Sequence, residues 1–323
     1  MPFWLLLLLA QPLSTPDRLD AEIRTIAAAA GGTVGVSIVR LESGERVSVR
    51  GGERFPMASV FKLPLAVEIL HRADAGSLPL DRVVRFTAAD LSPGHSPLAA
   101  QFPRGGEQSV EGLLERMLVE SDNTAADLLL PLAGGPAGVT ARLRALGIDG
   151  IRVDRSEVEL AWSYFGVDSV PLRADWSLAK FQRRIDAVPP DRRRAAAARF
   201  LSDSRDTATP EALASLLERV HRRDLVSPES SERLLAWMRR TTTGPARIKR
   251  LLPPSAEVAH RTGLCGDTAG INACTNDAGI VTLPNGAGHL AVVVLIRGSD
   301  RTLAAREDAI ARVARTAYDH WGR

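Results

Sequence analysis

The sequence has few of the residues and motifs that identify several large enzyme classes. Its 323 residues include only two cysteines, six histidines and 5% aromatic residues. It contains no C-x-x-C pair, no H-E-x-x-H sequence and no G-x-x-x-x-G-K-[ST] loop. The sequence therefore gives no support for a zinc protease or a P-loop nucleotide-binding enzyme.

Neither sign of charge is in large excess. The 41 Lys and Arg residues against 38 Asp and Glu residues give a net charge of +3. Such a small excess, spread along the chain, does not indicate a nucleic-acid partner. A composition of 45% hydrophobic and 24% charged residues is typical of globular proteins, and the length is sufficient for one large domain or two.

Long hydrophobic runs are scarce as well. An apolar run extends from Phe3 to Ala10, which is too short to span a bilayer but lies where the hydrophobic region of an export signal occurs. We predict a signal peptide at residues 1–14, although no Lys or Arg precedes the run; a buried N-terminal strand is the alternative. The mature protein is expected to be periplasmic or secreted, without a membrane anchor, in a compartment that permits disulfides.

The periodicity of apolar residues changes along the chain. Helical spacing over 17–32 is followed by a β-hairpin pattern over 33–51, and strand patterns return over 257–265, 276–286 and 289–299 before a final helix over 303–321. The periodicity from about 57 to 240 is almost wholly helical. We predict an α/β protein of the α+β type, in which residues 15–56 and 241–323 form an antiparallel sheet with the terminal helices packed on it. Residues 57–240 form an inserted helical domain.

A serine and a lysine lie three residues apart in the stretch SVFK, where a strongly apolar helical pattern begins. Ser59 could be a helix N-cap, but this does not explain Lys62, because an ammonium on an apolar helix face is desolvated at a cost. A desolvated lysine of lowered pKa can accept the proton of a serine hydroxyl and activate it as a nucleophile. On SVFK alone both interpretations stay open.

Two further short motifs follow SVFK along the chain. Ser121-Asp122-Asn123 separates two helical stretches, and Arg261-Thr262-Gly263 lies on a predicted strand. Taken singly, they are explained by a helix cap and by a glycine at a strand end.

Together with SVFK, these motifs resemble the three signature elements of class A serine β-lactamases and the related penicillin-binding proteins. The resemblance extends over nearly the whole mature chain, because further segments are similar to that family. These segments are SDNTAADLLL, DRSEVEL, RDTATP, TTTGPARI and NDAGIVTLPNG. The resemblance implies a five-stranded antiparallel sheet, a helical domain and an active site between them. It implies no metal and no cofactor, and a small-molecule β-lactam as substrate; we expect the protein to act as a monomer.

The resemblance also implies a role for each matching residue. Ser59 would attack the lactam carbonyl, and the backbone N–H groups of Ser59 and Leu264 would form the oxyanion hole. Lys62 would accept or relay the proton of Ser59, and Ser121 would pass a proton to the departing lactam nitrogen. Six other side chains would bind the substrate or anchor the omega loop in the ways that follow.

Asn123 would hydrogen-bond the side-chain amide of the substrate, while Arg261, which stands where lysine is usual, and Thr262 would bind its carboxylate next to Gly263. Arg247 matches a second carboxylate-binding arginine found in part of the family; an ordinary surface arginine is the alternative.

Glu157 matches the glutamate that activates the deacylating water, and this residue would make the protein a hydrolase. The alternative is a solvated loop residue. Whether Lys62 or Glu157 is the base for acylation is left open by the sequence. Arg155 and Asp206 resemble the ion pair that closes the omega loop, which spans about 154–210.

The sequence departs from the family pattern in three places. Ala161 replaces an asparagine that helps to hold the hydrolytic water, so deacylation is expected to be slow or to use another group. Glu157 and Asp206 are 49 positions apart, and an insertion of this size should have structure of its own. We predict a helical flap beside the site entrance. Cys265 and Cys274 lie on an extended turn, where a disulfide between them would pin the substrate-side strand.

Two other activities use the same serine, lysine and second serine. A D-alanyl-D-alanine peptidase or esterase is opposed by Glu157 and favoured by Ala161. A sensor that is acylated by β-lactams and deacylates slowly would normally carry a membrane tether, and no second apolar span is present.

Overall fold

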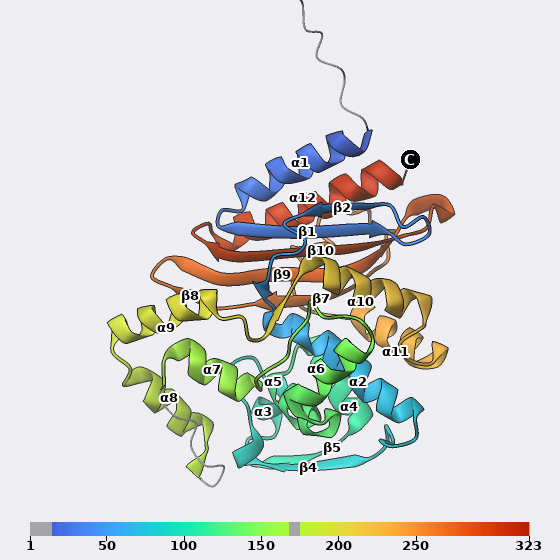
Figure 1. Ribbon diagram of the computed structural model, residues 1–323. Coiled ribbons are helices and arrows are strands. Elements are labelled where there is room, and N and C mark those ends of the chain that lie inside the picture. The colour runs from blue at the N-terminus through green and yellow to red at the C-terminus, as the bar shows by residue number, and fades with distance from the viewer. Residues whose placement is uncertain (1–14, 168–174, 323) are drawn as a thin grey trace, which may run out of the picture.

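The structure is a computed structural model that describes residues 15–167 and 175–322 (Figure 1). The predicted signal peptide at 1–14 lies outside the described residues. Among the described residues, no helix has the length and apolar character needed to cross a membrane.

A single antiparallel sheet joins the two ends of the chain. Its strands follow the order β2 (Arg46–Val49), β1 (Thr33–Arg40), β10 (His289–Ser299), β9 (Ile271–Thr282) and β7 (Val258–Leu264), and the two-residue strand β8 (Asp267–Thr268) pairs with β9 outside this order. Strand β1 pairs with β10 from Thr33 opposite Arg297 to Arg40 opposite Leu290. The predicted five-stranded antiparallel sheet is confirmed, with β8 as an addition.

The terminal helices cover one face of this sheet. Helices α1 (Thr15–Ala29) and α12 (Leu303–Trp321) lie side by side above it in Figure 1. Apolar side chains of both helices pack against strand residues such as Val36, Val292 and Val294 in one buried cluster. Because helices cover both faces of the sheet, β1 is buried at six consecutive positions instead of alternating.

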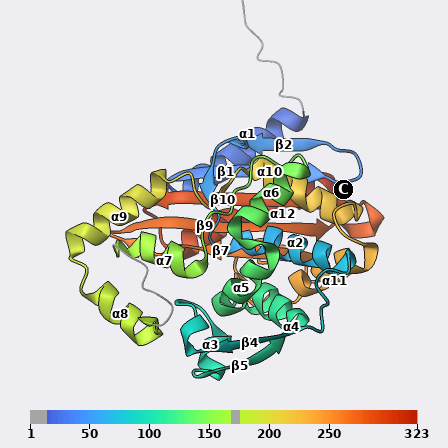
Figure 2. The same cartoon turned by 60° about the horizontal axis from the view of Figure 1, so that its bottom comes forward.

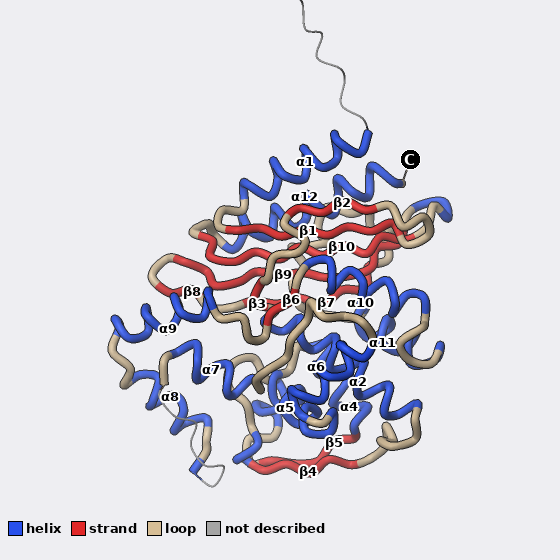
Figure 3. Tube along the Cα trace, viewed as in Figure 1, coloured by secondary structure: helices blue, strands red, loops and turns tan. Residues whose placement is uncertain are grey.

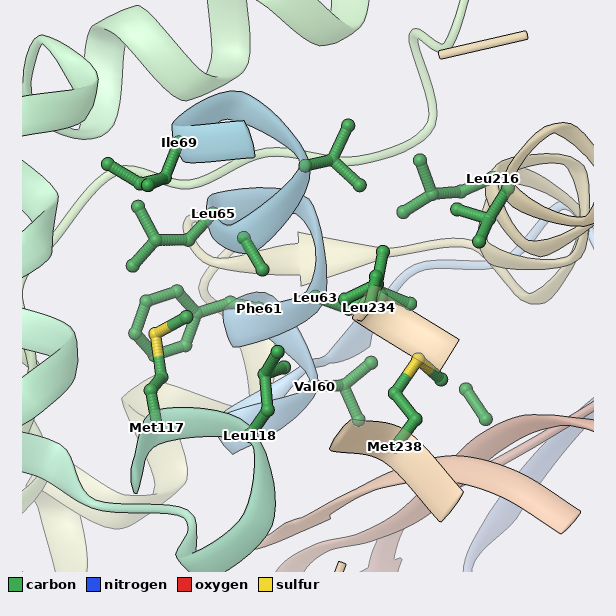
Figure 4. Close-up of a cluster of buried hydrophobic side chains, with 14 of the residues drawn as sticks. Val60, Phe61, Leu63, Leu65, Ile69, Met117, Leu118, Leu216, Leu234 and Met238 are labelled. Atoms are coloured by element: carbon green, nitrogen blue, oxygen red, sulfur yellow. The ribbon is translucent and has the colours of Figure 1, made fainter. Parts of the chain in front are cut away.

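The other face of the sheet rests on a helical body. Its helices are α2 (Lys62–Asp74), α3 (Pro97–Gln101), α4 (Val110–Glu115), α5 (Asn123–Leu129), α6 (Gly135–Ala145), α10 (Pro210–Arg222) and α11 (Pro228–Arg239). Helix α2 is buried over nine consecutive residues and lies at the centre of this body. Figure 4 shows Val60, Phe61 and Leu65 among side chains from surrounding helices, including Met117 and Leu234. This packing fixes the start of α2 and the turn before it, which carries Ser59.

The body is not wholly helical, contrary to the periodicity of the sequence. Strands β4 (Val83–Thr87) and β5 (Gly105–Ser109) form a separate two-stranded sheet at its far edge (Figure 3), and β3 (Phe55–Pro56) pairs with β6 (Thr207–Ala208). The exposed strand β4 has a single buried residue, Phe86, so it lacks the alternating pattern that identifies a strand. The division of the chain at residues 57 and 240 into two domains stays a prediction.

The long insertion forms helices at one side of the molecule. Helix α7 (Glu157–Phe165) is followed by α8 (Leu178–Asp186) and α9 (Pro190–Ser202), which project beside the sheet (Figure 2). Trp162, Trp176 and Phe181 pack together with ring centroids 5.2 to 5.9 Å apart. The insertion therefore has a small core of its own, as its length predicted.

Candidate active site

The segment SVFK forms a tight turn at the entrance to α2. Residues Ala58–Phe61 form a 3₁₀ helix that continues into α2 at Lys62, and its N-cap is Met57. The Ser59 side chain makes no capping hydrogen bond, so the N-cap interpretation of this serine is wrong. Ala58 has the left-handed φ of 44°, a strained conformation for a non-glycine residue that is often found at functional sites.

Lys62 lies at the centre of a network of polar contacts. Its side chain is 0% exposed, and Nζ lies 3.2 Å from Ser59 Oγ, to which it donates a hydrogen bond. It also donates to the carbonyl oxygen of Ser121 at 2.8 Å and to Oδ1 of Asn123 at 2.7 Å, and it lies 3.0 Å from Glu157 Oε1. Burial lowers the pKa of Lys62 and the Arg261 charge lowers it further, while Glu157 opposes both. A lowered pKa makes the Lys62 ammonium a better proton donor than an exposed lysine.

The second serine is held in an unusual backbone conformation. Ser121 has φ 64° and ψ 30°, and Arg261 Nη2 donates to its Oγ at 2.6 Å. The N-cap of α5 is the neighbouring residue Asp122, whose carboxylate accepts the N–H of Ala125. Asp122 thus anchors the turn, and the Ser121 hydroxyl points to the cationic pair formed by Lys62 and Arg261.

Strand β7 forms the opposite edge of the site. Gly263 is required there, because a Cβ at this position would lie 2.4 Å from the carbonyl oxygen of Met57, next to the turn that holds Ser59. Cys265 N–H donates to Cys274 O, so in an antiparallel ladder the preceding N–H, that of Leu264, points away from β9. Thr262 Oγ1 lies 2.6 Å from Thr243 Oγ1, a residue of the segment TTTGPARI.

Two arginines are buried beside the site. Among the described residues, Nε and Nη1 of Arg261 are buried without a hydrogen-bond partner. Burial lowers the pKa of Arg261 to about 10, against the opposing effects of Glu157 and Asp277, so the group stays charged at neutral pH. Arg247 is only 4% exposed, pairs with Glu307 at 3.1 Å and donates to the carbonyl oxygens of Gly263 and Asn276. The surface-arginine interpretation of Arg247 is therefore wrong.

Glu157 begins α7, directly after the N-cap Ser156. Its side chain is buried against Lys62, so the alternative of a solvated loop residue is wrong. The carboxylate of Asp127 accepts the N–H groups of Glu157 and Val158 at 2.8 and 3.1 Å. Burial, followed by the charge of Glu157, raises the pKa of Asp127 to about 7. The sequence analysis did not identify Asp127, although an acidic residue in the apolar run TAADLLL indicates a specific role for its carboxylate.

Two further predicted pairs are in contact. Arg155 Nε lies 2.5 Å from Asp206 Oδ2, and Asp206 Oδ1 accepts the N–H groups of Asp154 and Arg155. Cys265 and Cys274 form a disulfide. The ion pair closes the long loop at its base, and the disulfide links the two strands that leave the site.

Several of these residues line one cavity of about 650 Å³, a size suited to a drug-sized ligand, whereas Lys62 and Arg261 are fully buried and do not line it. Its wall contains Ser59, Ser121, Asn123, Glu157, Arg247, Thr262 and Leu264. It also contains residues of the insertion that the motif search did not include, among them Phe165 and Phe200. A hydroxyl beside a buried amine and a carboxylate, with N–H groups and cations around it, is an arrangement suited to acyl transfer on an anionic substrate.

Comparison with known proteins gives consistent matches over nearly the whole chain. The sequence profile of the Beta-lactamase enzyme family matches residues 18–321. The extended-spectrum β-lactamase PER-1 of Pseudomonas aeruginosa is 33% identical over 303 residues, which are 93% of this chain and 86% of that protein. The crystal structure of a β-lactamase from Chitinophaga pinensis aligns with a TM-score of 0.78 and 34% identity, over 94% of this chain and 98% of that one. An ancestral class A β-lactamase aligns with a TM-score of 0.75 and 32% identity, over 93% and 99% of the two chains.

Proposed function

The chain belongs to the β-lactamase enzyme family as a class A serine β-lactamase, and from this premise we propose how its residues divide the hydrolysis of β-lactams. Ser59 Oγ attacks the lactam carbonyl and forms an ester with it, while the carbonyl oxygen becomes an oxyanion. The N–H groups of Ser59 and Leu264 stabilise this oxyanion. The orientation of the Leu264 N–H supports this role, because the ladder bond of Cys265 turns it away from β9.

The proton of Ser59 leaves through the buried network. Lys62 Nζ is 3.2 Å from Ser59 Oγ and burial lowers the pKa of its ammonium, so a neutral Lys62 can accept the serine proton. Ser121 then supplies a proton to the lactam nitrogen as the C–N bond breaks, and the proton that Lys62 took from Ser59 passes to Ser121. The contacts of Ser121 with Arg261 and Lys62 support this relay, since both cations favour movement of a proton away from the hydroxyl.

Glu157 carries the second half of the reaction. It removes a proton from a water that attacks the ester carbonyl, and Ser59 is regenerated with its proton as the acid product leaves. The proposal of turnover, as opposed to simple acylation, rests on a single observation. The buried Glu157 carboxylate contacts Lys62 at one wall of the Ser59 cavity. A peptidase or a sensor is not favoured, because neither needs this carboxylate.

The cationic side of the cavity binds the substrate carboxylate. Arg261 offers Nε and Nη1, which are buried without partners in the described residues, and Thr262 offers its hydroxyl. Asn123 binds the side-chain amide of the substrate. Arg247 also lines the cavity and adds positive charge there, while its Nε pairs with Glu307 and its Nη1 donates to two backbone carbonyls.

The substrates we propose are penicillins and cephalosporins, which share the carboxylate next to the lactam. All groups of the site come from a single chain, so we propose a monomer as the working unit. We also propose export to the periplasm or medium, supported by the disulfide between Cys265 and Cys274.

Intact-mass spectrometry after mixing with excess benzylpenicillin tests the proposal. We expect a transient adduct of one penicillin with continuous product formation, and no adduct in the Ser59→Ala variant. A full adduct that persists without product would show a penicillin-binding protein instead, and an adduct in Ser59→Ala would exclude Ser59 as the nucleophile.

A further inference from the structure

The insertion supplies an apolar wall to the catalytic cavity. Leu160 and Phe165 of α7 and Phe200 of α9 line the same cavity as Ser59 and Ser121. Leu160 and Phe165 are partly exposed, whereas Phe200 is buried. Apart from Glu157, the side chains of α7 and α9 that line this cavity are all uncharged. This set, Leu160, Phe165 and Phe200, is called the aromatic wall below.

Tyr164, which also lines the cavity, holds the aromatic wall in place. Tyr164 contacts the rings of Phe165 and Phe200 edge to face, with centroids 5.2 and 5.3 Å away. Its hydroxyl lies 3.0 Å from Thr268 Oγ1 on β8, and Gly266 leaves room for it, since a Cβ there would lie 2.8 Å from the Tyr164 oxygen. The wall is therefore braced against the strand hairpin that borders the site.

A second contact connects the wall to the base of the omega loop. The Arg155 guanidinium lies 6.0 Å from the centre of the Phe200 ring, while the same side chain is paired with Asp206. Helix α9 also packs against β8 and β9, at the far left of Figure 1. A surface fixed in this way binds a ligand without first losing conformational entropy.

We propose that the aromatic wall binds the acyl side chain of the substrate and selects β-lactams whose side chain ends in an uncharged aromatic ring. The acyl side chain leaves the lactam ring next to the carbonyl that Ser59 attacks, so it must extend along the cavity. A substrate ring can pack edge to face on Phe165. A carboxylate in the same place would be desolvated with no cation from the wall to pair with it. This proposal rests on the function proposed above.

Two substrates separate recognition of the side chain from the chemistry. Benzylpenicillin carries a phenylacetyl side chain, whereas 6-aminopenicillanic acid has the same fused rings and a free amine. In Phe165→Ala we expect kcat/KM for benzylpenicillin to fall at least fivefold more than kcat/KM for 6-aminopenicillanic acid, with Phe165→Leu intermediate. We further expect the wild-type enzyme to prefer benzylpenicillin over its α-carboxy analogue at least tenfold.

A matched control comes from strand β4, outside the insertion. Phe86 packs on Phe102 and does not line the cavity, so Phe86→Leu should leave the ratio of the two kcat/KM values unchanged. Equal losses for both substrates in Phe165→Ala and Phe165→Leu, or no loss, would overturn the role of the wall while the hydrolytic function stands. Failure of the wild-type protein to hydrolyse either substrate would overturn the proposed function and the role of the wall together.

Discussion

The carboxylate of Asp127 holds Glu157 by its backbone: Asp127 Oδ1 accepts the Glu157 N–H at 2.8 Å, and Oδ2 accepts the next N–H along α7. Ser92 Oγ donates to the same carboxylate at 2.7 Å. The first two N–H groups of a helix have no partner within the helix, so Asp127 satisfies both and fixes the point at which Glu157 enters the cavity.

Stability should report on the ionisation of Asp127. Its pKa is raised to about 7 in the folded protein, against an ordinary value near 3.8, so the wild-type protein loses stability as pH rises from about 4 to 7. Asparagine does not titrate. We therefore expect the unfolding free energy of Asp127→Asn, taken relative to that of the wild type, to increase by about 2 kcal/mol from pH 5 to pH 8. One pKa unit is worth about 1.4 kcal/mol, and the partial exposure of Asp127 reduces the effect.

Urea unfolding of both proteins at pH 5, 6.5 and 8 measures this difference. Comparing the two proteins at each pH removes the contribution of all other titrating groups. A difference that is the same at the three pH values would show that Asp127 is already ionised throughout.

Removing the charge of Glu157 should separate the two halves of the reaction. In Glu157→Gln, Ser59 and Lys62 keep their 3.2 Å contact, so acylation should continue, while deacylation should slow by about 10²- to 10⁴-fold for lack of a base. Mass spectrometry should then find the acylated protein as the main species for minutes after mixing. Turnover at the wild-type rate would show that another group activates the water.

The parts of the structure that sequence could predict are those encoded within a few residues. Ser59 and Lys62 are one turn apart, and the motifs around Ser121 and Arg261 carry their chemistry in three residues each. The strands β9 and β10 were predictable because their apolar runs are long and flank a Pro-Asn-Gly turn.

The remainder depends on packing between distant segments. Phe200 reaches the cavity only because α9 folds back on the sheet hairpin, which no local pattern encodes. In the sequence, Asp127 is one polar position of α5. Its importance comes from its contact with the N-terminus of α7, 30 residues further along the chain. Strand β4 escaped prediction because four of its five side chains are not buried.

Supplying the missing amide should speed deacylation. Ala161 lines the cavity one turn after Glu157 on α7, where an asparagine would give the attacking water a second polar partner. In Ala161→Asn we expect the deacylation rate to rise about twofold to tenfold, the effect of one added hydrogen bond. Ala161→Leu, of similar size but without the amide, is the control and should not accelerate the step. An unchanged rate in Ala161→Asn, measured by single-turnover kinetics, would mean that the water is already fully held.

The bidentate guanidinium of Arg261 should matter only for substrates that carry a negative charge. Arg261→Lys keeps the charge but loses the bidentate geometry, and Arg261→Ala loses both and leaves Ser121 Oγ without its 2.6 Å donor. We expect kcat/KM for benzylpenicillin to fall about tenfold in the lysine variant and further in the alanine variant, because a hydrogen bond between charged groups is worth about 1.5–3 kcal/mol. The methyl ester of benzylpenicillin has the same side chain and lactam but no carboxylate. With this ester, wild type and Arg261→Lys should be nearly equal. If the lysine variant lost as much activity on the ester as on the acid, Arg261 would act through Ser121 and the proton relay and not through the substrate carboxylate.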